Sequence, residues 1–136
     1  MLTAATMWWL DVEFGNTWSP DRVANAESVR GAIDALRAAG AGVGVYSTSY
    51  QWRSLVGDFA PGVAVWVAGA PWSAAASWCD GTHGFGGGPT WMVQSVVGSF
   101  DNDYACAPAL AAAGAAWSLP LELPAPVSKV RPAATP

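Results

Sequence analysis

Apolar residues along this chain gather into short runs separated by turn residues, a pattern that predicts short buried strands. Five runs predict strands, and they cover Met7–Glu13, Gly42–Ser47, Val63–Ala68, Thr90–Val97 and Phe100–Tyr104. The first four are apolar almost throughout, which is typical of strands in a parallel sheet covered by helices. The first run also carries two carboxylates, Asp11 and Glu13, at its C-terminal end.

A stripe of apolar residues at helical spacing lies between the first two runs and predicts a helix that begins between Pro20 and Asn25. Ser19 and Asn25 are the alternative N-caps, and Gly40 is the expected C-cap. A second, shorter helix is expected at Gln51–Val56. The sequence therefore alternates strands and helices over its first half.

The second half of the chain carries weaker signals. Ser73–Trp78 is a candidate helix, and Gly81–Gly88 is a glycine-rich loop. Prolines recur after Ala116, which indicates a disordered or linker-like tail. We expect one folded domain over residues 1–116 and a tail over residues 117–136.

Polar side chains gather where the predicted strands end, which is typical of an α/β barrel or an open α/β sheet. In either architecture these ends form one face, and ligands bind there. Five strands are three short of a closed eight-stranded barrel. The polar set consists of Asp11, Glu13, Tyr46, Ser47, Thr48, Gln94 and Asp101.

The spacing of Asp11 and Glu13 places both side chains on one face of a strand, with Cα atoms about 6.5–7 Å apart. Ionised carboxylates at that separation repel each other, so at least one pKa is expected to rise, and Glu13 is the expected one. Glycoside hydrolysis uses such a pair, one carboxyl as the acid and the other as base, nucleophile or charge stabiliser. Two solvated acids at the end of a strand would explain the spacing equally well.

Composition narrows the possible partners. The net charge is −4 and no Lys/Arg cluster is present, which argues against nucleic acid. Nine tryptophans suit a core or a carbohydrate-binding cleft, and their number alone does not separate the two. No apolar run reaches the roughly 18 residues of a membrane span, and no signal peptide is expected in Met1–Leu10.

Five blocks of the sequence, taken in order, resemble the glycoside hydrolase family 25 lysozymes, and in particular their secreted actinobacterial branch. The blocks are WWLDVEFGNTWS, GAIDALRAAGAGVGVYSTSYQW, VWVAGA, FGGGPTWMVQ and FDNDYAC. The resemblance implies a TIM-like β/α barrel that hydrolyses the β-1,4 bond between N-acetylmuramic acid and N-acetylglucosamine in peptidoglycan.

The resemblance also assigns roles to single residues. It implies that Glu13 is the general acid, that Asp11 is its carboxylate partner and that Asp101 belongs to the catalytic site. The substrate-binding residues that it implies, together with loop aromatics expected on the same face, are Tyr46, Trp66, Gln94, Trp18 and Tyr50. Tyr46 and Trp66 could each pack in the core instead, whereas Trp18 and Tyr50 lie in predicted loops and are candidates for sugar stacking.

One departure from the family pattern is large. The family's barrel opens with a D-x-S strand that contributes another active-site aspartate, and no such segment precedes Asp11 here. The chain is therefore expected to form about five parallel strands, equivalent to strands four to eight, and to be inactive by itself. A non-catalytic polysaccharide-binding or structural remnant of the same fold is the alternative. The complete protein is expected to be secreted.

Cys79 and Cys106 are the two cysteines of the chain. An even pair in a protein of secreted type predicts a disulfide, and two buried thiols are the alternative. No metal is expected, because His83 is the single histidine and the cysteines lack C-x-x-C spacing. No cofactor is expected either.

Overall fold

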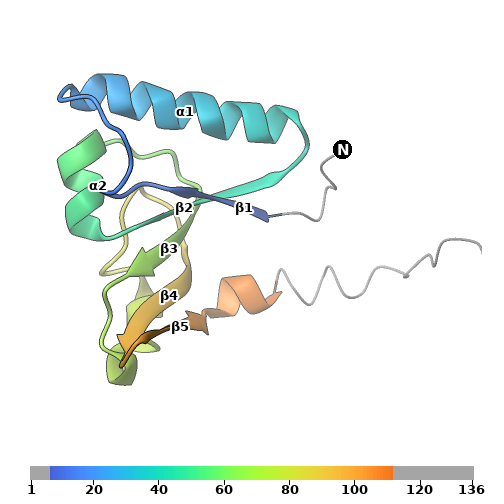
Figure 1. The fold of residues 1–136 in the computed structure, drawn as a ribbon. Helices are drawn as coiled ribbons and strands as arrows, with labels where there is room; N and C mark the ends of the chain where they lie inside the picture. The colour runs from blue at the N-terminus through green and yellow to red at the C-terminus, as the bar shows by residue number, and fades with distance from the viewer. Residues whose placement is uncertain (1–6, 112–136) are drawn as a thin grey trace, which may run out of the picture.

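Residues 7–111 are the part of the chain that the computed structural model describes, and they contain five strands, the α-helices α1 and α2, two short 3₁₀ helices and a last helical turn at residues 107–111 (Figure 1). Their bounds are β1 Met7–Asp11, α1 Arg22–Ala38, β2 Gly42–Ser47, α2 Ser49–Val56, β3 Ala64–Ala68, η1 Trp72–Ala74, η2 Ser77–Asp80, β4 Thr90–Val97 and β5 Phe100–Ala105. All five predicted strands are present within two residues of their expected bounds. The predicted tail and the boundary at residue 116 lie outside the described residues.

The strands form one sheet in the order β1-β2-β3-β4-β5, and the first four are parallel, as predicted. The expectation of five parallel strands is wrong for β5, which pairs with β4 in the antiparallel sense. Only Gly98 and Ser99 join these two strands, and Gly98 has a φ of 65°. A two-residue connection makes a hairpin, whereas parallel neighbours need a crossover of a dozen or more residues.

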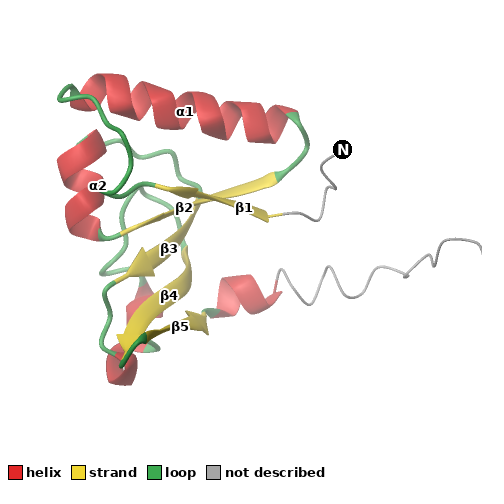
Figure 2. Cartoon of the chain, viewed as in Figure 1, coloured by secondary structure: helices red, strands yellow, loops and turns green. Residues whose placement is uncertain are grey.

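The sheet curls and has α1 and α2 on one side, so the described residues form a mixed α/β fold consistent with part of a barrel (Figures 1 and 2). Side chains alternate along β2 and β3, and Val45, Val65 and Val67 are fully buried on the helix side. β1 is an edge strand of the described sheet. The opposite face has no helix across it and carries the candidate site.

Asp21 caps α1, which corrects the expectation of Ser19 or Asn25. The Asp21 side chain accepts hydrogen bonds from the backbone N–H groups of Val23 (2.8 Å) and Ala24 (3.4 Å). Asn25 is instead a buried residue within the helix. A carboxylate two and three residues before these N–H groups is well placed to accept from them, and its charge also favours the helix N-terminus.

The short helices differ from expectation at their ends. α2 begins at Ser49, two residues before the predicted Gln51, because the Thr48 side chain accepts from the N–H of Gln51 and caps the helix. The candidate helix at Ser73–Trp78 is replaced by η1 and η2, two separate 3₁₀ turns. No helix of residues 7–111 is long and apolar enough to cross a bilayer.

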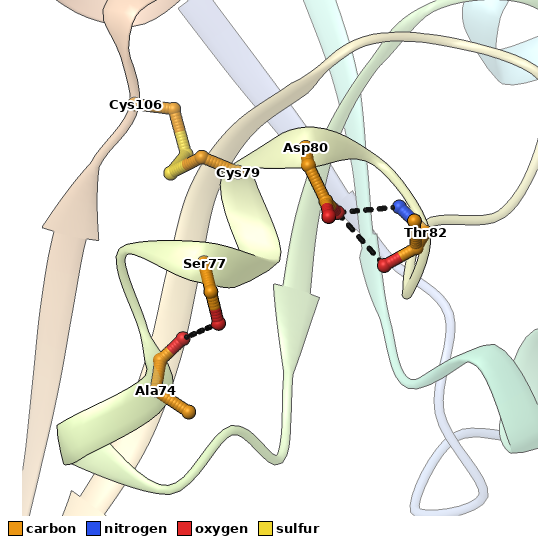
Figure 3. Close-up of a disulfide and its surroundings, with 6 residues drawn as sticks. All are labelled: Ala74, Ser77, Cys79, Asp80, Thr82 and Cys106. Carbon is orange, nitrogen blue, oxygen red and sulfur yellow. Dashed lines mark hydrogen bonds between the residues drawn. A yellow bond between two sulfur atoms is a disulfide. The ribbon is translucent and has the colours of Figure 1, made fainter.

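Cys79 and Cys106 form the predicted disulfide, with an S–S distance of 2.01 Å and a Cα–Cα distance of 5.6 Å (Figure 3). Cys79 lies in η2, and Cys106 directly follows β5. In the same turn, Asp80 accepts from both the N–H and the hydroxyl of Thr82, each at 2.8 Å. The bond thus fastens the β3–β4 connection to the end of the hairpin.

Candidate active site

An open hollow of about 300 Å³ lies on the helix-free face of the sheet, and Trp9, Asp11, Tyr46, Trp66 and Gln94 line it. The strand register explains why these residues meet, since Asp11 is opposite Tyr46 and Tyr46 is opposite Trp66. Four of the five were expected at the site from the sequence, and Trp9 was not. Its signal was the alternation of strand side chains, which puts Trp9 on the same face as Asp11.

Glu13 lies just beyond β1, in a turn that is pinned to β2. The N–H of Val12 donates to the carbonyl of Tyr46 (2.9 Å), and the hydroxyl of Ser47 donates to the carbonyl of Val12 (2.6 Å). Val12 and Ser47 are both buried. These bonds fix the backbone on which the two carboxylates stand.

The pKa of Glu13 is raised above its ordinary value of 4.5. Burial is the largest cause, the negative charge of Asp11 is the second, and a hydrogen bond with the Asp11 side chain is the third. The direction of the shift and the effect of the Asp11 charge are as predicted. Chemically, a carboxyl in this position retains its proton to higher pH than a free glutamic acid, which a general acid requires.

Tyr46 is a fixed hydrogen-bond donor at the centre of the hollow. Its hydroxyl donates to Oε1 of Gln94 at 2.6 Å. Burial raises the pKa of Tyr46 to about 12, and nearby negative charges add to this effect. These charges belong, in decreasing order of effect, to Glu13, Asp11, Asp101 and Asp103. The tyrosine therefore stays protonated, and four carboxylates share one small region.

Trp66 lies edge-on between two other aromatic rings. Its centroid is 5.0 Å from that of Tyr46 at an interplanar angle of 69°, and 5.7 Å from that of Trp9 at 73°. Gly44 makes room for Trp9, because a Cβ at that position would lie 2.3 Å from the Trp9 ring. The three rings therefore meet at steep angles and enclose a corner of the hollow.

β5 supplies the carboxylates on the far side of the hollow. Asp103 is opposite Gln94 in the hairpin register and accepts a hydrogen bond from the Trp66 indole nitrogen at 3.0 Å. Burial raises the pKa of Asp103, the bond from Trp66 lowers it, and the charge of Asp101 raises it, for a net increase. Sequence reasoning included Asp101 and missed Asp103, although strand alternation places both on one face.

The two loop aromatics do not line this hollow. The Trp18 indole donates to the carbonyl of Glu13 (2.7 Å), and its ring lines a separate hollow between β1 and α1. Tyr50 is 74% exposed, and its ring meets that of Phe14 edge-on at 5.9 Å. Within residues 7–111, no group of three or more His, Cys, Asp or Glu side chains is placed to hold a metal ion.

The fold and site define a class: an α/β protein whose strand ends carry a carboxylate pair beside an aromatic corner. A family model described as lysozyme-like protein 1 matches residues 2–73, more than half of the chain. The chain is also 36% identical over 88 residues to the probable GH family 25 lysozyme 4 of Dictyostelium discoideum. No solved structure matches the chain.

The chain belongs to the family of lysozyme-like proteins related to glycoside hydrolase family 25, as the sequence blocks predicted. The alignment with the Dictyostelium relative covers 65% of this chain and 40% of the relative. The chain therefore spans well under half the length of the curated relative that it matches. The actinobacterial branch stays a prediction.

Proposed function

We propose that the chain carries the acid-bearing part of a muramidase-type glycoside hydrolase. The substrate is the β-1,4 bond between N-acetylmuramic acid and N-acetylglucosamine in peptidoglycan. The supporting observation is that Glu13, with its raised pKa, interacts with Asp11, and Asp11 lines a hollow together with aromatic rings. A probable GH family 25 lysozyme among its relatives supports the same reaction class.

In the proposed mechanism, Glu13 donates its proton to the glycosidic oxygen as the bond to the anomeric carbon breaks. The Asp11 carboxylate stabilises the positive charge that develops on the sugar ring. A water molecule then adds to the anomeric carbon and gives up a proton to Glu13, which completes hydrolysis and restores the acid. Asp101 adds to the negative field of Asp11, which already acts on Tyr46. Because its pKa is raised, Glu13 retains its proton to higher pH than an ordinary glutamic acid does.

Glycan binding is proposed for the aromatic corner. The apolar faces of sugar rings pack on aromatic side chains, and a volume of about 300 Å³ is at the lower end of the range for ligand pockets. Tyr46, Trp66 and Gln94 would contact the sugar in the hollow, and Tyr50 with Phe14 would contact a neighbouring sugar at the rim. Trp18 supports the Glu13 turn from the helix side.

We further propose that β1 to β5 are equivalent to strands four to eight of the family's TIM-like barrel. The sequence holds no D-x-S segment, so the additional aspartate of the family's first strand has no counterpart in it. We therefore expect the chain by itself to turn over slowly at best. A disulfide fits an extracellular location for the protein, since such bonds persist in oxidising compartments.

Long incubation of purified peptidoglycan with the chain tests this function, with mass spectrometry of the released muropeptides. We expect traces of products that end in reducing N-acetylmuramic acid, and a loss of at least about 100-fold in Glu13→Gln, which removes the transferable proton. Glu27→Gln, on the exposed face of α1, is the matched control and should keep the parent rate. Equal product from Glu13→Gln and the parent, or glycan binding without any product, would contradict the catalytic assignment.

A further inference from the structure

Trp66 is the residue on which the aromatic corner depends. It stands on β3, and its ring is in edge contact with Tyr46 on one side and Trp9 on the other. Such contacts are worth only about 0.5–1.5 kcal/mol each and tolerate a range of ring angles. The indole N–H, by contrast, is a single directed donor, so its acceptor determines how the ring is turned.

That acceptor is Asp103, at 3.0 Å from the indole nitrogen. Asp103 lies on β5 directly opposite Gln94 on β4, and Gln94 accepts the Tyr46 hydroxyl. The β4–β5 hairpin therefore supplies one acceptor for Tyr46 and another for Trp66. The Tyr46 bond does not depend on Asp103, so the two acceptors can be removed separately.

The backbone around Asp103 is held at both ends. On one side the strand enters through the Gly98–Ser99 turn, and on the other it ends at Cys106, which is bonded to Cys79. The N–H of Cys106 also donates to the carbonyl of Trp91 at 2.9 Å. A carboxylate on a strand held in this way is a fixed acceptor.

We propose that Asp103 is a positioning residue for glycan binding: by accepting the Trp66 indole N–H, it holds the Trp66 ring in the orientation that stacks on a sugar. The glycan part of this inference rests on the proposed function. Asp103 acts through Trp66 and carries out no chemistry on the substrate. It is distinct in this respect from Glu13, Asp11 and Asp101.

The test compares Asp103→Ala with Asp103→Asn, which keeps a side-chain oxygen that can accept the same bond. The first measurement is the NMR chemical shift of the Trp66 indole N–H, assigned by its loss in Trp66→Phe. The second is the dissociation constant of a soluble β-1,4-linked N-acetylglucosamine tetrasaccharide, measured by calorimetry. Asp34→Ala on the exposed side of α1 is the control, because it removes one carboxylate away from the hollow.

Asp103→Ala should shift the indole resonance and weaken tetrasaccharide binding about fivefold, whereas Asp103→Asn and Asp34→Ala should match the parent. An unchanged indole resonance in Asp103→Ala would overturn the inference. So would a shifted resonance with unchanged tetrasaccharide affinity, or failure of Asp103→Asn to restore both readouts. If the parent itself does not bind the tetrasaccharide, the glycan role fails, and the resonance still reports whether Asp103 orients Trp66.

Discussion

At the scale of single residues, Glu13 is an acid whose surroundings favour its protonated form. Its pKa is higher in the folded protein than its ordinary value of 4.5, so the folded state binds more protons than the unfolded state between those two values. The contribution of protonated Glu13 to the free energy of unfolding is therefore fully present below about pH 4.5. This contribution is lost as the pH rises through the folded pKa.

Replacing Glu13 by glutamine should accordingly stabilise the protein at pH 7, because glutamine never acquires the charge that burial and Asp11 oppose. The free energy of unfolding in urea should exceed that of the parent at pH 7 and match it at pH 4. Glu27→Gln should stay within about 0.5 kcal/mol of the parent at both pH values, since Glu27 forms an exposed pair with Arg30. A Glu13→Gln protein no more stable than the parent at pH 7 would contradict the raised pKa.

Asn25 illustrates a second residue-scale effect, that of a buried polar side chain with every bond made. Its amide donates to the carbonyls of Ser19 and Leu55, each at 2.9 Å, and its oxygen accepts from the N–H of Ser19 at 3.0 Å. Asn25→Ala should cost about 3 kcal/mol, because it strands these buried backbone groups. Ser28→Ala, which removes an exposed bond on the same helix, should cost under about 0.5 kcal/mol in the same denaturation assay. If Asn25→Ala cost as little as Ser28→Ala, water would be bonding the backbone groups that the Asn25 amide bonds in the parent.

The sequence predicted only some of these roles. Asp11 and Glu13 stood out because two acids interrupt an apolar run, and burial then acted on Glu13 as expected. Asp103 was not predicted, because Asp-Asn-Asp suits a turn as well as it suits sugar binding. Asn25 was expected as a cap because asparagine is common there, while Asp21 had the better geometry. Whether a polar residue is buried depends on how its helix packs against the neighbouring helix. The local sequence does not specify that packing.

At the scale of secondary structure elements, four strands were predictable because each is apolar over most of its length. The direction of β5 was not deduced, although the two-residue Gly98–Ser99 connection excludes a parallel crossover. The short 3₁₀ turns η1 and η2 replaced a helix in a segment whose periodicity was weak. Local signals thus served best for elements with a continuous apolar face.

The contact between β1 and β2 depends on a glycine. A side chain at Gly44 would meet both the Trp9 ring at 2.3 Å and the carbonyl oxygen of Ala64 at 2.9 Å. Gly44→Ala should therefore destabilise the protein by about 2 kcal/mol through overpacking, measured by thermal or urea unfolding.

Gly31→Ala is the control for this prediction. Gly31 lies on the exposed face of α1, and a Cβ at this position would have no atom within 4 Å. Gly31→Ala should stabilise the protein by about 0.5–1 kcal/mol, because alanine is more favourable than glycine inside a helix. Combining Gly44→Ala with Trp9→Leu should cost less than the sum of the single changes, since the smaller side chain relieves the clash. Strict additivity would mean that Gly44 does not act through Trp9.

At the scale of the whole molecule, the sheet order follows the order of the chain, and α1 and α2 cover one face. The strand–helix alternation was sufficient to predict this α/β class. It did not show that β1 lies at the edge of the described sheet, because the order of strands depends on long-range pairing. The convergence of four carboxylates on Tyr46 likewise required the assembled register.

Within the described residues, the disulfide joins two positions that are 27 residues apart in the sequence. The double variant Cys79→Ala/Cys106→Ala should lose about 3–4 kcal/mol of unfolding free energy, because its unfolded chain is freer. Urea unfolding with and without dithiothreitol checks this: reductant should lower the midpoint of the parent and leave that of the variant unchanged. A parent midpoint unaffected by complete reduction would contradict the expected contribution.

The same bond also determines how the molecule would respond to a pull on its two ends. Tension entering along the backbone at Cys79 crosses the two sulfurs to Cys106 and leaves the intervening segment slack. At about 3.4 Å per stretched residue, the 27-residue separation corresponds to about 90 Å of chain that cannot extend until the disulfide is reduced. β1, β2 and β3 lie on the path of the force, whereas β4 and β5 lie in the slack segment. The carboxylates of Asp101 and Asp103 therefore lie where no tension is transmitted.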